Sequence, residues 1–530
     1  MVCFPSLEKM DKLLYNGSKD IGKRGESFLA RSTTETCCLT LPLKLEKWQA
    51  DRLEKRLEIA RQLYNTLLRF ELKKLKRMEA REDYLAVQQQ IKEAQNEAER
   101  KKLFKQLEKI RSAAGFSENT FTTDMKKFYK HFNENIGSNV AQHGIAPQVW
   151  TAFKKLFYEN GKSVHFKKRG DITSVQGASI TGKSGGKEIY FRGTFIEWFG
   201  LKLPIKLDPG NDYENEMLKK HVKYCRLIKK PGRNKSHWYV QLSLEGKPAV
   251  KYNRQTGEVL HPIGHGKVGI DIGPQTIAYA AENEVKLLEL ADRVNNIERE
   301  KRVLARKLDR SRRATNPDNY AEDGTIKRGV KLTRNKSKRY IKCQRQLANL
   351  MHRQADIRKR QHNELANHLL SLGDQFYIED MAWPALTHRS TKTEVSEKTG
   401  KIKRKKRFGK SVGNKAPATL TGLLDIKLKS RGLQGIVEVP TSVKASQYNH
   451  ITDDYQKKKL SERWNHMPDG RQIQRDLYSA FLLQHMNETR TGFDQEALNR
   501  DYEHFVFLHD QCIEALKKAP KTVAFMVIWN

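Results

Sequence analysis

The chain has 530 residues, too many for one hydrophobic core, so roughly two to four domains are expected. Lysine and arginine number 100 against 62 acidic residues, a formal net charge of +38 at pH 7. No apolar run approaches the ~18 residues of a membrane span, and Met1–Gly25 lacks the apolar core of a signal peptide, so we expect neither a membrane segment nor a secretory leader. The charge favours a polyanionic partner, nucleic acid by default, over a basic surface that is merely solvated.

The N-terminal third is mostly helical by pattern. Residues 1–35 are polar and without period, which predicts a loose arm, and Cys37–Leu45 alternates like a strand. From Trp48 onward the apolar residues recur at helical spacing, and helical sequence continues to about residue 112 and again from about 122 to 158. The residues that share one face of the first helix are Leu53, Leu57, Ala60, Tyr64, Leu67 and Leu68.

Short strands are expected next, broken by glycine-rich and lysine-rich turns. They are Ser163–Lys168, Glu188–Arg192, Val222–Ile228 and Trp238–Leu244. With the early strand near residue 40 they predict a β-barrel-like module. Aromatic and cationic residues alternate here, as in His165–Lys168; such side chains either stack on bases and contact phosphates or belong to the core.

From Lys267 the order of elements is diagnostic. Three strands are expected first, then a long helical stretch with a polar loop near Asn316–Gly329, and then strand, helix, strand and helix. The five strands are the one that carries Asp271, then Thr276–Ala281, Val285–Leu290, Gln375–Glu379 and Gly435–Pro440, and the helix between the last two spans about 416–433. This is the order of the ribonuclease-H-like fold, in which strands one, four and five are parallel neighbours.

In that fold the middle of strand one, the end of strand four and the start of the last helix converge. These places hold Asp271, Glu379 and Asp476. Crowded carboxylates raise one another's pKa, and two Mg²⁺ ions about 4 Å apart would relieve the repulsion. One ion would activate water for in-line attack on a phosphodiester and the other would stabilise the leaving 3′-oxygen; oxygen ligands favour Mg²⁺ or Mn²⁺ over Zn²⁺. Two alternatives stay open: Asp380 as the ligand in place of Glu379, and Asp476 as a helix cap.

Three segments resemble the RuvC motifs of TnpB, the family of transposon-encoded RNA-guided nucleases, and of related type V CRISPR effectors. They read GIDIGPQTIA, FYIEDMAW and QRDLYSAF, and the opening LPLKLEKWQADRLEKRLEIARQLYN resembles the family's first strand and helix. The resemblance covers roughly residues 37–490. It implies a multidomain α+β protein in which an RNase-H-like (RuvC) α/β nuclease domain follows a wedge β-barrel and a helical recognition lobe.

The resemblance divides the chain into successive parts. These are an arm at 1–35, a first wedge strand at 36–46, a helical recognition lobe at 47–160, a wedge β-barrel at 161–266, a RuvC domain at 267–444 with a helical insertion at 291–372, an insert at 445–474, the third motif at 475–490 and a C-terminal extension at 491–530. The extension ends in an apolar run, VAFMVIW, that is expected to pack against the body.

The implied activity is guide-RNA-directed, Mg²⁺-dependent cleavage of double-stranded target DNA beside a short flanking motif. The implied partners are a guide RNA and the target DNA, and the implied location is the prokaryotic cytoplasm, at the nucleoid when the protein is on its target. Two alternatives are an RNA-guided DNA-binding repressor that does not cut and a transposase proper. The carboxylates Asp271, Glu379 and Asp476 favour the nuclease over the repressor.

The chain departs from the family at two places. Relatives usually carry a CxxC…CxxC zinc ribbon between the second and third motifs, whereas 445–474 contains no cysteine, and His450 and His466 alone cannot build a tetrahedral site. We therefore predict an insert without structural zinc. The side chains expected to hold it together are Tyr448, Tyr455, Leu460 and Trp464. Gln474 is the second departure, because many relatives have an acid there.

Two basic segments are candidates for nucleic-acid contact. Arg389–Lys415 holds eleven lysines and arginines against two glutamates and follows the end of strand four, so it would overhang the site and guide a DNA strand or shield the metals; a solvated linker or a look-alike of a nuclear-localisation signal is the alternative. Its densest run is Lys403, Arg404, Lys405, Lys406 and Arg407. The helix after strand three carries Arg306, Lys307, Arg310, Arg312 and Arg313, which the resemblance places against a heteroduplex backbone.

Overall fold

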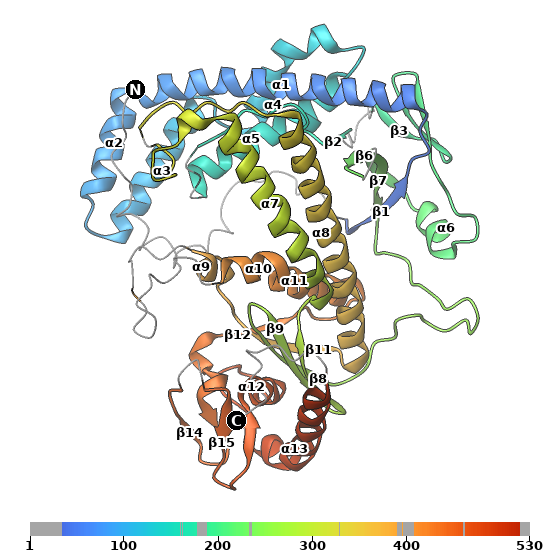
Figure 1. Cartoon of the computed structure of the whole chain (residues 1–530), viewed down its shortest axis with the longest axis vertical. Helices are drawn as coiled ribbons and strands as arrows, with labels where there is room; N and C mark the ends of the chain where they lie inside the picture. Colours follow the sequence, from blue (N-terminus) through green and yellow to red (C-terminus); the bar gives the residue numbers. More distant parts are fainter. Residues whose placement is uncertain are drawn as a thin grey trace.

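The computed structural model describes residues 34–159, 161, 163–177, 188–232, 236–327, 329–388, 395, 408–458 and 462–519. Figure 1 shows a helical body with small sheets at the top and a larger sheet with its helices at the bottom. A long helical hairpin, α7 with α8, runs between them. No described helix is both long and apolar enough to cross a membrane. The expected arm at 1–35 lies almost wholly outside the described residues.

The upper body is built on one long helix. The helix α1 buries the stripe predicted for it, from Leu53 to Leu68, and a capping box between Glu46 and Gln49 starts it. The other helices pack on it around a phenylalanine cluster that includes Phe116, Phe121 and Phe153. The elements are α1 (Lys47–Glu79), α2 (Glu82–Glu93), α3 (Glu97–Ala113), α4 (Glu118–Tyr129), η1 (Lys130–Phe132), η2 (Val140–Ile145) and α5 (Ala146–Tyr158).

Two small sheets complete this body. One has the order β1-β7-β6-β2 and the other β3-β4-β5, and an isolated bridge between Leu43 and Ile205 joins them. Among the described residues they do not close into a barrel, so the expected barrel is corrected to two open sheets. The elements are β1 (Thr36–Pro42), β2 (Ser174–Gln176), β3 (Ile189–Phe191), β4 (Phe195–Trp198), β5 (Leu201–Pro204), α6 (Asp212–Leu218), β6 (Val222–Lys230) and β7 (His237–Glu245).

The strand expected at Ser163–Lys168 is absent, and that prediction was wrong. The backbone of Lys167 bonds to side chains of α1 instead of to a neighbouring strand. Asn65 donates from Nδ2 to the Lys167 carbonyl at 2.9 Å and accepts from its N–H at 2.8 Å, and Arg61 donates to the same carbonyl at 3.1 Å. These backbone groups are therefore satisfied without a ladder.

The lower body is organised by a five-stranded sheet of order β10-β9-β8-β11-β12. The first three strands are antiparallel, and β8, β11 and β12 are parallel neighbours, as the order of elements predicts. The strands are β8 (Lys267–Ile272), β9 (Thr276–Ala281), β10 (Glu284–Glu289), β11 (Gln375–Glu379) and β12 (Val437–Val439). The bounds of β9 and β11 are those expected from the sequence.

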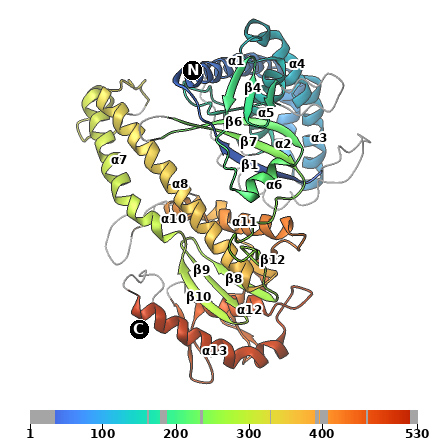
Figure 2. The ribbon, with the colours of Figure 1, turned by 90° about the vertical axis from the view of Figure 1, so that its right-hand side faces the viewer.

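Helices cover both faces of this sheet (Figure 2). On one face Val268, Ile270, Phe376 and Ile378 pack with α8 and α11, and on the other face α12 and α13 cover the sheet. Because side chains alternate along a strand, Gly269 and Asp271 point to the α12 side. The helices and turns of this body are η3 (Asp292–Val294), α7 (Asn295–Thr315), η4 (Pro317–Asn319), α8 (Lys338–Leu372), α9 (Trp383–Thr387), α10 (Gly409–Lys415), α11 (Pro417–Ser430), α12 (Arg475–Gln484) and α13 (Gln495–Lys518).

The segment before α12 forms two short hairpins. They consist of η5 (Thr441–Val443), η6 (Ala445–Gln447), β13 (Tyr448–Asn449), β14 (Asp454–Tyr455), β15 (Trp464–His466) and β16 (Gln472–Gln474), and they pack on α12 and α13. The sequence did not predict α13 as a helix, only as an extension. The apolar end expected to pack, at 523–529, lies outside the described residues.

Candidate active site

Asp271 is partly buried, as are the other two candidate carboxylates, Glu379 and Asp476. It follows Gly269 on the α12 face of β8, and α12 lies directly on that glycine. A Cβ built there would be 2.0 Å from the carbonyl oxygen of Ala480 and 2.3 Å from the backbone nitrogen of Gln484. Because Gly269 has no side chain, α12, which carries Asp476, can approach the strand that carries Asp271.

Glu379 ends β11 beside Asp271. The parallel register pairs Ile378 with Ile270, so the next residue on each strand, Glu379 and Asp271, point to the same face. Asp380 is exposed, follows the strand, and by alternation points to the other face; its N–H donates to the Val439 carbonyl at 2.9 Å. Of these two acids, Glu379 is the one that interacts with Asp271.

Asp476 is the second residue of α12 and does not cap it. The cap is Gln474, whose side-chain oxygen accepts from the Leu477 N–H at 2.8 Å. Gln474 is fully buried, and its own N–H donates to Nε2 of His509 on α13 at 3.0 Å. Two arginines approach the Asp476 carboxylate, Arg463 at 3.5 Å and Arg475 at 3.4 Å.

The three carboxylates are electrostatically coupled. Burial raises the pKa of Asp271 to about 8, helped by the negative charges of Asp476 and Glu379, while Ser479 and Arg475 act in the opposite direction. Burial also raises the pKa of Glu379. The negative charges of Glu379 and Asp476 thus oppose the ionisation of Asp271 on a single side of the sheet.

This donor set suits a hard divalent cation in its chemistry. All the donors are carboxylate oxygens, and a cation between them would remove the repulsion that raises the pKa of Asp271. Within the described residues no group of three or more His, Cys, Asp or Glu side chains lies close enough together to hold a metal ion. At Asp476, Arg463 and Arg475 supply positive charge.

The basic candidates on α7 fall into two sets. Arg312 and Arg313 both pair with Asp309, the second at 2.8 Å, and the guanidinium of Arg313 lies 4.6 Å from the ring centre of Tyr320. Arg306, Lys307 and Arg310 are exposed. The candidates Lys403, Arg404, Lys405, Lys406 and Arg407 lie outside the described residues.

The insert before α12 is held by aromatic contacts with the C-terminal helix. Tyr448 stacks on Phe493 with ring centres 4.7 Å apart and lies 5.0 Å from the ring of Tyr455, which is itself half exposed. Trp464 meets His509 edge-on at 6.2 Å. Leu460 lies outside the described residues.

The two histidines of the insert are in different environments. His450 is buried, its Nδ1 lies 2.6 Å from the Tyr478 hydroxyl, and burial lowers its pKa to about 4. His466 is exposed. His466 lines a cavity of about 560 Å³, together with Lys457, Lys458 and Trp464 among others.

Sequence reasoning missed two residues that act on the candidate site. Arg463 is separated from Asp476 by a hairpin, and no local pattern marks it. His509 supports the cap of α12 from the following helix, 35 positions along the chain. The only available signal was the unusual glutamine at 474, which fits a cap as well as a lost acid.

Comparisons with known proteins found matches only among solved structures: no family model and no curated protein matches the chain. A complex of Cas12f1 with sgRNA and target DNA matches at 13% identity and a TM-score of 0.39, covering 86% of this chain and 99% of that chain. A CRISPR-Cas12f ternary complex matches at 13% identity and a TM-score of 0.23, with 82% of each chain covered. With TM-scores this low, neither match defines the fold or the activity of this chain.

Proposed function

We propose that the chain is an RNA-guided DNA endonuclease that hydrolyses target DNA with two divalent metal ions in a RuvC-type, RNase-H-like site. The observation that carries the proposal is the placement of Asp271, Glu379 and Asp476 on one side of a sheet of order β10-β9-β8-β11-β12, where burial and the charges of the other two acids raise the pKa of Asp271. The motif resemblance to TnpB-family nucleases around each of these acids points the same way. A net charge of +38 suits a protein that holds RNA and DNA together.

The residues of the site have separable tasks. Asp271, Glu379 and Asp476 would hold the ions, Mg²⁺ or Mn²⁺, after approaching one another more closely than they do in this structure, and the bound ions would supply a nucleophilic water and stabilise the leaving 3′-oxygen. Gln474 fixes the start of α12 and thereby the direction of Asp476. Arg463 and Arg475 neutralise charge at Asp476 and lie where an anionic phosphodiester would approach.

The coupled acids also separate the proposal from a repressor. A protein that only occupies DNA has no use for a carboxyl such as that of Asp271, whose pKa is raised by burial and by two neighbouring acids, because its ionised form destabilises the fold without a cation. A transposase proper would share the acids, but it would bind DNA ends without a guide RNA.

The test is the variant Asp271→Ala, with Glu438→Ala on β12 as the control because Glu438 is an exposed acid of the same sheet. Cleavage of plasmid DNA by the protein copurified with its RNA should fall at least about a hundredfold in Asp271→Ala, since an electrostatic element of the transition state is lost. RNA and DNA binding should stay within about twofold of the parent chain. Cutting that survives in Asp271→Ala would overturn the assignment of the site.

Sequencing the copurified RNA tests the guide. A discrete structured RNA with a variable end supports the proposal, whereas random fragments would favour a nuclease or transposase that reads DNA by itself.

A further inference from the structure

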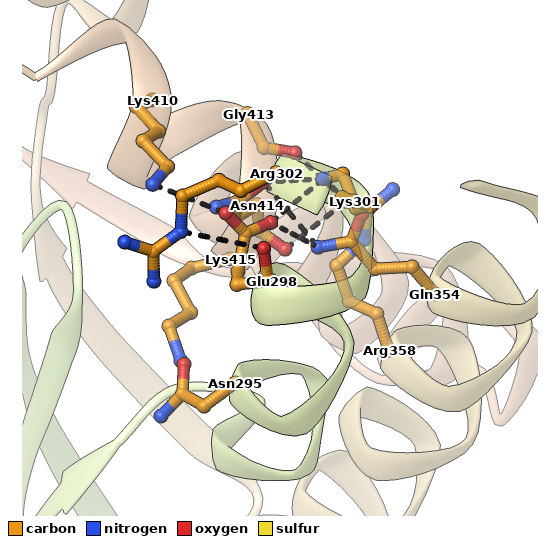
Figure 3. Close-up of polar contacts among 10 residues, drawn as sticks. All are labelled: Asn295, Glu298, Lys301, Arg302, Gln354, Arg358, Lys410, Gly413, Asn414 and Lys415. Carbon is orange, nitrogen blue, oxygen red and sulfur yellow. Dashed lines mark hydrogen bonds and ion pairs between the residues drawn. The ribbon is translucent and has the colours of Figure 1, made fainter. Parts of the chain in front are cut away.

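The α7–α8 hairpin has two sides with different surroundings. On one side a polar cluster ties it to α10 (Figure 3). Lys301 on α7 bonds Glu298 at 2.7 Å and Gln354 of α8 at 2.8 Å, and Arg358 donates to the carbonyls of Gly413 at 2.9 Å and Asn414 at 3.1 Å. This side of the hairpin is therefore covered by α10 of the same chain.

The other side, at the base of the hairpin, contains a cavity of about 300 Å³, which we term the hairpin notch. Its floor is apolar, made by Ile297 of α7 and Ile357 of α8. Its rim carries the cations Arg293, Arg353 and Arg360 and one acid, Glu364. The volume is at the lower end of the range for small-ligand sites.

The rim arginines are largely free of acids. Arg293 lies 3.4 Å from Glu364, and both side chains are more than half exposed, so this pair is weak. Arg353 and Arg360 are exposed and have neither an ion pair nor a hydrogen bond from their side chains to any described residue. Asp356, about one turn from each of them, pairs with neither.

Two guanidiniums beside an apolar floor suit one class of ligand. Arg353 and Arg360 are about two turns apart on α8, so they share a face and point into the same space. A guanidinium without an acid partner presents a planar fork of N–H donors that matches the oxygens of a phosphodiester, and the apolar floor accommodates the adjoining sugar.

The notch also continues a row of cations along the hairpin. Arg310 lies about four turns beyond Asn296, another lining residue, on the same face of α7. Lys342 lies about three turns from Arg353 on the same face of α8, and both Arg310 and Lys342 are exposed. Since the two helices are antiparallel neighbours, these cations extend from the base toward the tip.

We propose that the hairpin notch binds a backbone phosphate of the nucleic acid held by this chain, through Arg353 and Arg360, without reading its sequence. The proposal rests on the proposed function only in assuming that nucleic acid is bound. The phosphate could belong to the guide RNA or to the target DNA, and the experiment distinguishes these sources.

The experiment compares the double variant Arg353→Gln, Arg360→Gln with the parent full chain. The probes are an RNA–DNA hybrid of about 20 base pairs and the RNA and DNA duplexes of the same sequence. Dissociation constants are measured by fluorescence anisotropy between about 50 and 200 mM salt. We expect roughly tenfold weaker binding at low salt and a salt slope reduced by about 1 to 2, for hybrids of any sequence, because phosphate contacts release counterions.

The matched control is Arg302→Gln, Lys359→Gln, which removes the same charge from exposed positions about a third of a turn away from the notch on the same two helices. It should change affinity by less than about twofold. Equal losses of affinity in the two double variants, or no loss in Arg353→Gln, Arg360→Gln, would overturn the proposal that the hairpin notch binds a phosphate. Unfolding midpoints equal to the parent's confirm that both variants are folded, as expected for exposed positions.

A charge-keeping variant and the three probes complete the test. Arg353→Lys, Arg360→Lys should keep the salt slope and lose part of the affinity, since an ammonium cannot bond a phosphate through a fork. A larger loss on the RNA-containing probes assigns the phosphate to the guide, and a larger loss on the DNA duplex assigns it to the target. A parent chain that binds no probe would overturn the proposed function, independently of the notch variants.

Discussion

At the residue scale, Asp271 couples the candidate chemistry to stability. In the unfolded chain its carboxyl has a pKa near 3.8, and in the folded chain burial and two neighbouring acids raise the pKa to about 8. The folded state therefore binds the proton more tightly. The contribution of this group to stability is fully present below about pH 4 and is lost as the pH rises through about 8.

The variant Asp271→Asn tests how much stability the folded chain loses when Asp271 ionises. Asparagine cannot ionise, so the metal-free variant should be more stable than the parent chain at pH 8.5 by about 5 kcal/mol, and the difference should vanish near pH 4. Urea unfolding in the presence of a chelator measures both free energies of unfolding. Glu438→Gln, at an exposed acid of the same sheet, should leave the profile unchanged. A parent chain whose stability does not fall between pH 4 and 8 relative to Asp271→Asn contradicts the argument.

At the scale of elements, the contact between β8 and α12 decides where Asp476 lies. The backbone of α12 crosses Gly269 so closely that no Cβ fits, with the Ala480 carbonyl at 2.0 Å from its ideal position. The obstacles are backbone atoms, which cannot rotate away. From the far side α13 supports the same helix, because His509 accepts from the backbone of Gln474.

The variant Gly269→Ala should push α12 away from the sheet. We expect a loss of about 3 kcal/mol or more in the free energy of unfolding, from overpacking between two backbones, together with loss of cleavage. Gly422→Ala is the control, because Gly422 is exposed in α11 and a Cβ there meets nothing within 4 Å. It should stabilise the chain by about 0.5 to 1 kcal/mol. A tolerated Gly269→Ala would show that α12 does not depend on this approach.

At the scale of the whole molecule, the α7–α8 hairpin reaches from the five-stranded sheet toward the helical body (Figure 1), and α8 alone is about 50 Å long. Its base is pinned through α10. Lys415 is buried and bonds Glu289 at the end of β10 at 2.7 Å, the Ala291 carbonyl at 3.2 Å and Asn295 at the start of α7 at 2.9 Å. One side chain thus joins α10, the sheet and the hairpin.

Replacing Lys415 should weaken the contacts among α10, the sheet and the start of α7. Lys415→Met leaves the carboxylate of Glu289, only 15% exposed, without its cation, and should lower the free energy of unfolding by about 3 kcal/mol. Lys410→Met is the control, because it removes a lysine that is 67% exposed and pairs with Glu298 in the polar cluster (Figure 3). It should change the free energy of unfolding by less than about 1 kcal/mol. Hydrogen exchange should accelerate in the first turns of α7 only in Lys415→Met. Equal effects of the two variants would contradict a pin at Lys415.

The sequence predicted much of the lower body, because its elements carry strong local patterns. The strands β9 and β11 begin and end where the apolar runs of the sequence predict, and the stripe from Leu53 to Leu68 is buried as its helical spacing predicts. The order of the strands also predicted which of them are parallel neighbours. The assignment of Asp271, Glu379 and Asp476 as metal ligands stays a prediction that cleavage assays must decide.

What the sequence determined by itself was therefore periodicity, order and charge, which are properties of neighbouring residues. Only the tertiary structure decided that Ser163–Lys168 is not a strand, because Asn65 and Arg61, about 100 positions away, satisfy the backbone of Lys167. It alone showed that Arg463 and His509 act on the start of α12, and that the notch gathers Arg293 with Arg353 and Arg360. Such pairings leave no local pattern, since they depend on which surfaces meet once the whole chain is packed.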